Sequence, residues 1–294
     1  MRILKDGKGI KIFANIFFII FSLMVIVPFL LLVSISFTDQ DTLMRYGAHL
    51  IPKVWSLQAY KVIFKVPGEM LYHMFFTIII ALTVPIGQAL VSSMFGYALS
   101  HDDFVAKKFF DVYLIYAMLI GGGLIPMYVI VKNIYHLDGI ILFYLLGLTS
   151  SWSVILYRTF FKGIPHSLIE SARLDGATEF QTLTHVVFPM SKSMYGIQYF
   201  TAVIGLWNNW ETNLIWLNED KKIWTIQYYL QKMLTDFEQI KASYVEAGLE
   251  TSFKIPITTI KYASCVLALI PIFIVFPKIS KTFSKGVAIG SVKG

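Results

Sequence analysis

The stretch SLIESARLDGATEFQTLTHVVFP, residues 167–189, is the polar segment whose residue types and spacing most clearly specify local chemistry. Ser167 stands three residues before Glu170, which is the spacing of a capping box. In such a box the serine hydroxyl accepts a hydrogen bond from the glutamate amide, and the carboxylate accepts one from the serine amide. We therefore expect a short helix to begin at Ser167.

The same stretch also contains the signals for a helix end and for the start of a second helix. Asp175-Gly176 is typical of a helix end, because glycine adopts the left-handed conformation without a Cβ penalty. Thr178 and Gln181 repeat the capping-box spacing, and the helical pattern after them runs to Pro189. The sequence thus predicts a helix, a glycine turn and a second helix that ends at Pro189.

Catalytic and metal-binding patterns are absent from the sequence. It has no G-x-x-x-x-G-K-[ST] loop for nucleotide phosphates, and no Ser/His/Asp arrangement is assembled. The lone Cys265 excludes a disulfide within the chain. The histidines never pair at ligand spacing on one helix; they are His49, His73, His101, His136, His166 and His185. We predict no catalytic residue, no metal site and no cofactor held by this chain itself.

The clearest acid within an apolar run is Glu211, in GLWNNWETNLIW. It follows Trp207, Asn208, Asn209 and Trp210. Tryptophan near a span end commonly anchors the membrane interface. Alternatively, these five residues form a wet, aromatic-lined site for a hydroxyl-rich solute, with indole faces covering sugar C–H groups and amides binding hydroxyls. Both interpretations stay open, and one acid at a span end is thin support for ion coupling.

Membrane-spanning helices have to position these segments. Of the 294 residues, 56% are hydrophobic and 15% charged, with a mean hydropathy of +0.65, whereas soluble domains are about 45–50% apolar and about 25% charged. A span needs about 20 apolar residues. We predict an all-α polytopic membrane protein, one transmembrane domain over 1–294 with six spans: 12–37, 71–99, 112–131, 140–161, 195–217 and 260–276.

The third of these runs contains Gly121–Gly122–Gly123 shortly before Pro126. The glycines suggest a kink or a close approach of two helices. Ordinary packing through small residues is the simpler interpretation, and a gating hinge is the alternative.

The charge balance indicates which side of the membrane each loop faces. With the N-terminus placed in the cytoplasm, and each charge within a span assigned to its nearer side, the inside carries fourteen Lys and Arg against seven Asp and Glu, and the outside carries eleven of each. The net charge of +7 therefore lies on one side, as the positive-inside rule requires. We expect both termini in the cytoplasm, and the basic excess indicates topology rather than nucleic-acid binding.

The expected loops are 38–70 and 218–259 outside and 162–193 inside. In the second outer loop, apolar residues recur at three- and four-residue spacing, which predicts an amphipathic helix. These residues are Ile223, Ile226, Leu230, Met233, Phe237 and Ile240. The helix would lie at the lipid surface or dock an external partner.

The spacing within 167–189 resembles the EAA–G–I-x-LP loop of ABC importer permeases. Ser171 stands for the second alanine, Val186 for the isoleucine and Phe188 for the leucine, while the glutamate, glycine and proline anchors are kept. The matching residues are Glu170, Ser171, Ala172, Gly176, Val186, Phe188 and Pro189.

More of the chain is similar to carbohydrate permeases of this family. LWNNWETNLIW looks like the W-N-x-aromatic segment of their fifth span. GGGLIPMYVIVKNI, the basic tail and the GSVKG ending look like the subgroup for complex oligosaccharides and polysaccharide fragments. The chain also resembles the second permease of the maltose importer, and only the outer loops are poorly constrained by the resemblance.

The resemblance implies a type I ABC importer permease fold. The inner loop would carry a coupling helix seated in a cleft of a separate ATPase subunit. Glu170 would anchor it, Gly176 would permit the turn, and Ala172 with neighbouring apolar side chains would fill the cleft. The implied ATPase-coupling residues are Glu170, Ser171, Ala172, Asp175, Gly176 and Pro189.

The resemblance also implies partners and a location. These are a homologous second permease, two ATPase subunits that bind ATP and Mg, an extracytoplasmic solute-binding protein that touches the outer helix, and a sugar substrate, in a bacterial plasma (inner) membrane. The tail with Lys278, Lys281, Lys285 and Lys293 would also reach the ATPase. The alternatives are an ion-coupled secondary transporter, an ABC importer for a non-sugar solute, and a membrane-bound enzyme.

Overall fold

The computed structural model describes residues 7–65, 67–148, 150–217, 219–247 and 255–290, and within these ranges it contains helices and no strand. Some expected features lie outside the described residues: 248–254 of the second outer loop, and 291–294 with Lys293 and most of the GSVKG ending. The side chains of Lys278, Lys281 and Lys285 also lie outside them.

The chain forms two compact units. The first comprises Met1–Glu69 and Leu230–Phe273. It holds α1 (Gly7–Ser36), α2 (Gln40–Tyr46), α3 (Gln58–Ile63), most of α14 (Ile226–Glu246) and the first half of α15 (Ile257–Gly290).

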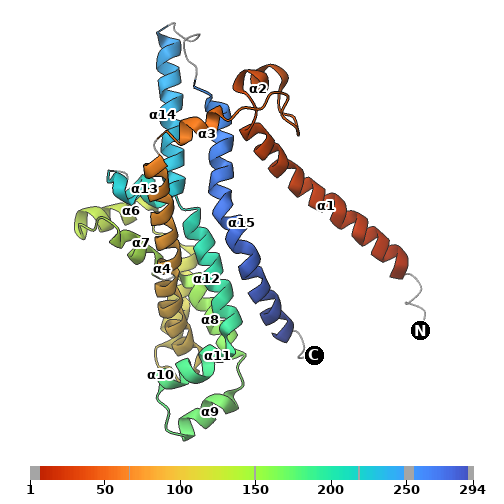
Figure 1. Ribbon diagram of the computed structural model, residues 1–294. Coiled ribbons are helices and arrows are strands. Elements are labelled where there is room, and N and C mark those ends of the chain that lie inside the picture. Colours follow the sequence, from red (N-terminus) through yellow and green to blue (C-terminus); the bar gives the residue numbers. More distant parts are fainter. Residues whose placement is uncertain (1–6, 66, 149, 218, 248–254, 291–294) are drawn as a thin grey trace. The chain divides into compact units, whose positions relative to one another are not determined.

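The second unit comprises Met70–Tyr229 and Ile274–Gly294. Its helices are α4 (Pro67–Ser100), α5 (Lys107–Leu119), α6 (Leu124–Tyr128), α7 (Ile141–Gly147), α8 (Ser151–Lys162), α9 (His166–Leu174), α10 (Glu179–Thr182), α11 (Phe188–Met190), α12 (Lys192–Trp207) and α13 (Glu211–Trp216). Two π-helical segments, η1 (Val129–Ile134) and η2 (Leu183–Val187), and one 3₁₀ turn, η3 (Lys221–Ile223), connect them. In Figure 1, α9 and α10 lie beyond one end of α4, and α13 lies near its other end.

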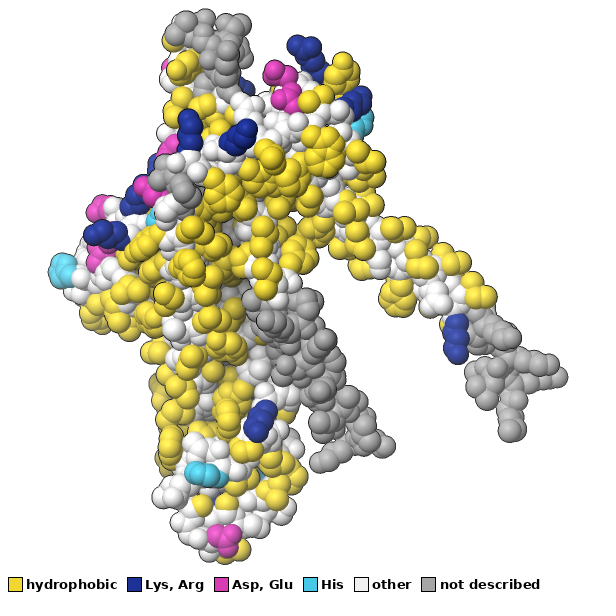
Figure 2. Space-filling view, viewed as in Figure 1, with side chains coloured by type: hydrophobic (Ala, Val, Ile, Leu, Met, Phe, Trp, Pro, Cys, Tyr) yellow, Lys and Arg dark blue, Asp and Glu magenta, His cyan; other side chains and the backbone are white. Residues whose placement is uncertain are grey.

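Among the described residues, three helices are long and apolar enough to cross a membrane, over residues 9–36 of α1, 68–100 of α4 and 257–274 of α15. Two bent pairs, α5 with α6–η1 and α7 with α8, raise the number to five if each pair is one span. The expected fifth span, 195–217, is divided between α12, which has 16 residues, and the separate α13. Figure 2 shows hydrophobic side chains along the sides of α1 and α4, which suits helices that face lipid. The count of six spans stays a prediction.

The expected third span, 112–131, is broken at its glycines. The axis turns by 112° between Leu119 and Leu124, and Gly123 adopts φ 83°, which side-chain-bearing residues rarely take. A Cβ at Gly121 or Gly122 would meet no atom of this chain within 4 Å. Within the described chain, the three glycines therefore break the helix and do not bring two helices together.

The amphipathic helix expected outside is present as α14, Ile226–Glu246. It begins three residues later than the apolar series, because Ile223 belongs to the 3₁₀ turn η3. Ile226 and Leu230 are buried, whereas Ile240 is exposed.

Two apolar clusters divide the length of α4. One gathers Ile80 and Val84 with Leu142, Phe143 and Trp216. The other gathers Tyr97 with Tyr157 and Phe161 of α8 and with Leu183 and Val187 of η2. At 1.5 Å per residue, Ile80 and Tyr97 are about 25 Å apart along the helix, close to the thickness of a hydrocarbon core.

The crossing of α4 and α8 depends on Gly96. A Cβ at this position would lie 2.7 Å from the Tyr157 Cβ, 3.0 Å from the Arg158 amide nitrogen and 3.0 Å from the Val154 carbonyl oxygen. Since two of these three atoms are backbone, the helices would have to separate to accept even a methyl group.

We predict that Gly96→Ala lowers the free energy of unfolding by about 1–3 kcal/mol, the usual cost of overpacking. Gly205→Ala is the matched control, because a Cβ at Gly205 of α12 meets nothing within 4 Å. Thermal unfolding of the purified permease in detergent measures both. An equal effect of the two substitutions would contradict the packing role of Gly96.

Candidate functional site

The helix α9 starts earlier than the expected capping box. It begins at His166 with Pro165 as its N-cap, and no side chain caps it. Ser167 therefore lies inside the first turn, and its carbonyl accepts a hydrogen bond from the Ser171 hydroxyl at 2.8 Å. The predicted box between Ser167 and Glu170 is wrong, because Pro165, with φ −57°, already starts the chain into the helix.

The glycine turn and the second capping box are confirmed. Asp175 ends α9, and Gly176 has φ 83°. The amide of Ala177 donates to the Ala172 carbonyl at 3.0 Å, which is the six-residue bond of a Schellman end. Thr178 donates its amide to the Gln181 side chain at 2.8 Å, and its hydroxyl accepts the Gln181 amide at 3.3 Å.

The second helix does not end at Pro189, as its sequence had predicted. It continues from α10 through the π-helical η2 into α11, Phe188–Met190, and stops at Ser191. Proline lacks an amide donor and clashes with the carbonyl four residues earlier in an α-helix. The wider π turn before it places Pro189 in the first turn of α11, where its missing donor is tolerated.

The expected coupling residues lie mostly on the surface of this loop. Glu170, Ser171, Asp175, Gly176 and Pro189 are exposed, and Ala172 is half-buried. The apolar side chains of α9 divide between two faces. Ile169 is buried in its own chain, whereas Leu168 is 41% and Leu174 89% exposed. The outward face of α9 thus combines carboxylates with uncovered leucines.

Glu179, which sequence reasoning missed, joins this loop to α4. One of its carboxylate oxygens accepts from the Arg173 guanidinium at 2.8 and 2.9 Å, and the other accepts from the Tyr97 hydroxyl at 2.8 Å. The six-residue spacing of Arg173 and Glu179 across a glycine turn was a usable signal. Tyr97 lies 82 residues away, and nothing local points to it.

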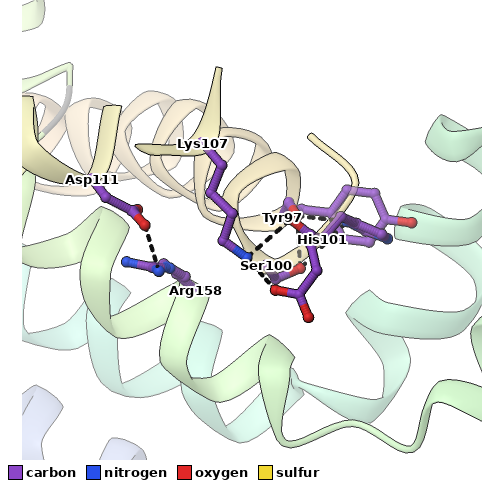
Figure 3. A network of polar contacts seen from close by, with 7 residues as sticks. Tyr97, Ser100, His101, Lys107, Asp111 and Arg158 are labelled. Carbon is purple, nitrogen blue, oxygen red and sulfur yellow. Dashed lines mark hydrogen bonds and ion pairs between the residues drawn. The ribbon is translucent and has the colours of Figure 1, made fainter. Parts of the chain in front are cut away.

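A second polar group binds the end of α4 to α5 and α8 (Figure 3). Arg158 of α8 pairs with Asp111 of α5 at 2.7 Å, and both side chains are about four-fifths buried. Lys107 donates to the His101 carbonyl at 3.1 Å and pairs with Asp102. The hydrogen bond and charge of Lys107 hold the pKa of Asp102 below its usual range. Arg158 was visible in the sequence as a charge within an expected span.

The five residues of the second candidate site differ in burial and in hydrogen-bond partners. Trp207 is buried. The Asn208 amide donates to the Ile204 carbonyl at 3.1 Å, and the Asn209 side chain accepts from the Thr212 amide at 3.0 Å. Two further members of the set, Trp210 and Glu211, are exposed.

Asn213 of α13 is fully buried and is the centre of a cluster of polar contacts. Its side-chain amide donates to the Ile223 carbonyl at 2.8 Å and accepts from the Thr225 amide at 2.9 Å. The hydroxyl of Thr77 on α4 accepts from the Ile226 amide at 2.8 Å. This polar cluster thereby fixes the chain between α13 and α14 against the first half of α4.

Beside α13 lies a cavity of about 800 Å³. Trp216, stacked on Tyr128 with ring centroids 5.4 Å apart, forms one wall. Lys132 and Asp138 form another and are paired at 2.8 Å. Hydrogen bonds from Lys132 and from the Gly139 amide hold the pKa of Asp138 below its usual range. Among the described residues, no three His, Cys, Asp or Glu side chains gather closely enough to hold a metal ion.

Curated proteins resemble the chain along nearly its whole length. It is 32% identical over 285 residues to the polygalacturonan/rhamnogalacturonan transport system permease protein YtcP of Bacillus subtilis (strain 168), covering 95% of this chain and 96% of that protein. This chain belongs to the sugar ABC transporter permease family. The arabinooligosaccharides transport system permease protein AraQ of the same organism is 26% identical to the permease over 289 residues, covering 97% and 96%.

The fold of the permease matches that of a solved ABC importer. A crystal structure of a bacterial ABC transporter involved in the import of the acidic polysaccharide alginate aligns with a TM-score of 0.71 at 22% identity, covering 95% of the permease and 98% of that chain. No family model matches the permease. Its relatives are transport subunits, which favours ABC import over ion-coupled transport or an enzyme activity.

We predict that Gly176→Val opens the turn after α9, because a β-branched residue at φ 83° is strained by about 1–2 kcal/mol or more. Gly176→Asn should preserve the turn, since asparagine tolerates this conformation and no atom crowds the position. Hydrogen exchange of the peptide containing Gly176 and Ala177 measures the effect. Equal protection in both variants would contradict it.

Proposed function

We propose that this permease forms half of the transmembrane path of an ATP-driven importer for an oligosaccharide delivered by an extracytoplasmic binding protein. The observation that carries the proposal is the 32% identity over 96% of a permease named for polygalacturonan and rhamnogalacturonan transport. Relatives named for arabinooligosaccharides and maltodextrin support a sugar rather than a non-sugar solute.

We further propose six spans with both termini in the cytoplasm of a bacterial cell, in its plasma (inner) membrane. The net charge of +7, which the six-span topology places on one side, supports this orientation. A homologous second permease would complete the path, and two ATPase subunits would bind ATP and Mg. The amphipathic α14 would lie on the outside, where the binding protein docks.

The proposed coupling element is the loop 162–193. An apolar side chain as exposed as Leu174, at 89%, next to the carboxylates of Glu170 and Asp175, suits a surface that another protein covers. The Schellman end of α9 and the capping box at the start of α10 would keep this loop folded in water without help from lipid. A rigid element of this kind transmits the closure of an ATPase pair as a rigid-body movement.

The proposed substrate path runs along Trp207, Asn208, Asn209, Trp210 and Glu211. Exposed Trp210 offers an aromatic face, and Glu211 offers hydrogen-bond acceptors for sugar hydroxyls. The helix α13, which begins at Glu211, also lines the cavity beside Trp216, so solute and water would have space near this end of α12.

Purification of the tagged permease from its own membranes tests the assembly. We expect a stoichiometric ATPase and a second permease to copurify, and we expect the cells to import one of a panel of galacturonan, rhamnogalacturonan, arabinan and maltodextrin fragments. A lone permease that drives uptake from an ion gradient would contradict the proposal.

We predict that Glu170→Ala abolishes this uptake while the permease still inserts in the membrane, because the exposed carboxylate would lose its ATPase partner. Asp103→Ala is the matched control, an exposed carboxylate in the turn between α4 and α5. The measurement is uptake of the imported fragment together with permease abundance. If the Glu170→Ala permease takes up the fragment at the unchanged rate, the coupling role of Glu170 is contradicted.

A further inference from the structure

Glu179 binds two partners that come from different parts of the permease. Arg173 belongs to the last turn of α9. Tyr97 belongs to the last turns of α4, a helix that does not adjoin the coupling loop in sequence. One carboxylate therefore connects the proposed ATPase-binding helix with the end of α4.

The exposure of these groups indicates a positioning role. The side chains of Arg173 and Glu179 are 38% and 58% exposed, so water competes with their ion pair and the pair adds little to folding stability. Tyr97 is 6% exposed, and its hydroxyl donates to Glu179. A charged acceptor makes this hydrogen bond directional and short. The geometry thus fixes where α9 stands relative to α4.

Tyr97 is firmly attached on its own side. Its ring belongs to the cluster with Phe161 of α8 and Val187 of η2. Its carbonyl accepts from the Ser100 hydroxyl at 2.6 Å, and the His101 Nδ1 lies 2.9 Å from the same oxygen. Figure 3 shows these contacts at the end of α4. A displacement of Glu179 would consequently move the end of α4 as a body.

We propose that Glu179 is a positioning residue that transmits movement of α9 to α4 through Tyr97, in addition to the movement passed along the chain to α8 and α12. This inference rests on the proposed coupling function of the loop. Glu179 lies between Gly176 and Val186 and is not one of the residues by which this loop resembles the loop of ABC importer permeases.

Two substitutions test the Tyr97–Glu179 contact and the Arg173–Glu179 contact separately. Tyr97→Phe removes the hydroxyl and keeps the ring in its cluster. Glu179→Gln keeps an acceptor for Tyr97 and removes the charge that binds Arg173. Asp103→Asn is the matched control, because Asp103 is an exposed carboxylate near the same end of α4.

The test uses the complete transporter, with its ATPase and binding protein, in liposomes. The measured quantity is the amount of the imported panel fragment taken up per ATP hydrolysed. We expect this ratio to fall about fivefold or more in Tyr97→Phe and in Glu179→Gln, the low end of allosteric coupling. The double variant should fall no further than the worse single one, since both changes break one link.

A purely structural role would reduce the yield of assembled transporter and leave the ratio unchanged, and that result would overturn the inference. An unchanged ratio in both single variants would overturn it as well. The proposed function fails separately, if Glu170→Ala transports at the normal rate. Loss of uptake in Glu170→Ala with normal ratios in the other two would reject the role of Glu179 alone.

Discussion

Hydrocarbon offers no hydrogen bond to a peptide group, and this constraint shapes most of the permease. Backbone that crosses lipid has to satisfy its own donors and acceptors, which is why the long apolar stretches of α1, α4 and α15 are helical. Where a helix breaks, other groups supply the bonds. At the end of α13 the buried side chain of Asn213 binds the carbonyl of Ile223 and the amide of Thr225. The irregular backbone between α13 and α14 is thus served by a buried polar side chain.

The same constraint leaves the ends of the helices to carry the polar chemistry. The loop with α9 and α10, proposed to lie in water, is held locally by its Schellman end and its capping box. The hydrogen bond from Tyr97 then ties this loop to α4. About 25 Å along α4 from this contact, Ile80 packs with Trp216 beside the cavity next to α13. One helix therefore connects the proposed ATPase side with the proposed substrate side.

Local spacing predicted much of this. Period and run length gave an all-α chain with long apolar helices, and the Thr178–Gln181 box and the Gly176 turn are confirmed because they depend on neighbours in sequence. The Ser167 box was wrong because Pro165 started the helix sooner, and the helix passes Pro189 because a π turn precedes it. Tyr97–Glu179 and Asp111–Arg158 join residues 82 and 47 positions apart, which no local pattern specifies. The roles of the coupling and substrate-path residues stay predictions.

A photo-crosslinking amino acid at Leu174, an apolar side chain of α9 that is 89% exposed, tests the central claim most directly. In native membranes, with the same probe at exposed Phe13 of α1 as control, we predict one adduct specific to position 174. Mass spectrometry should identify its partner as an ATPase subunit carrying a nucleotide-binding loop. If the probe at position 174 reacts but none of its adducts contains an ATPase subunit, the account is contradicted.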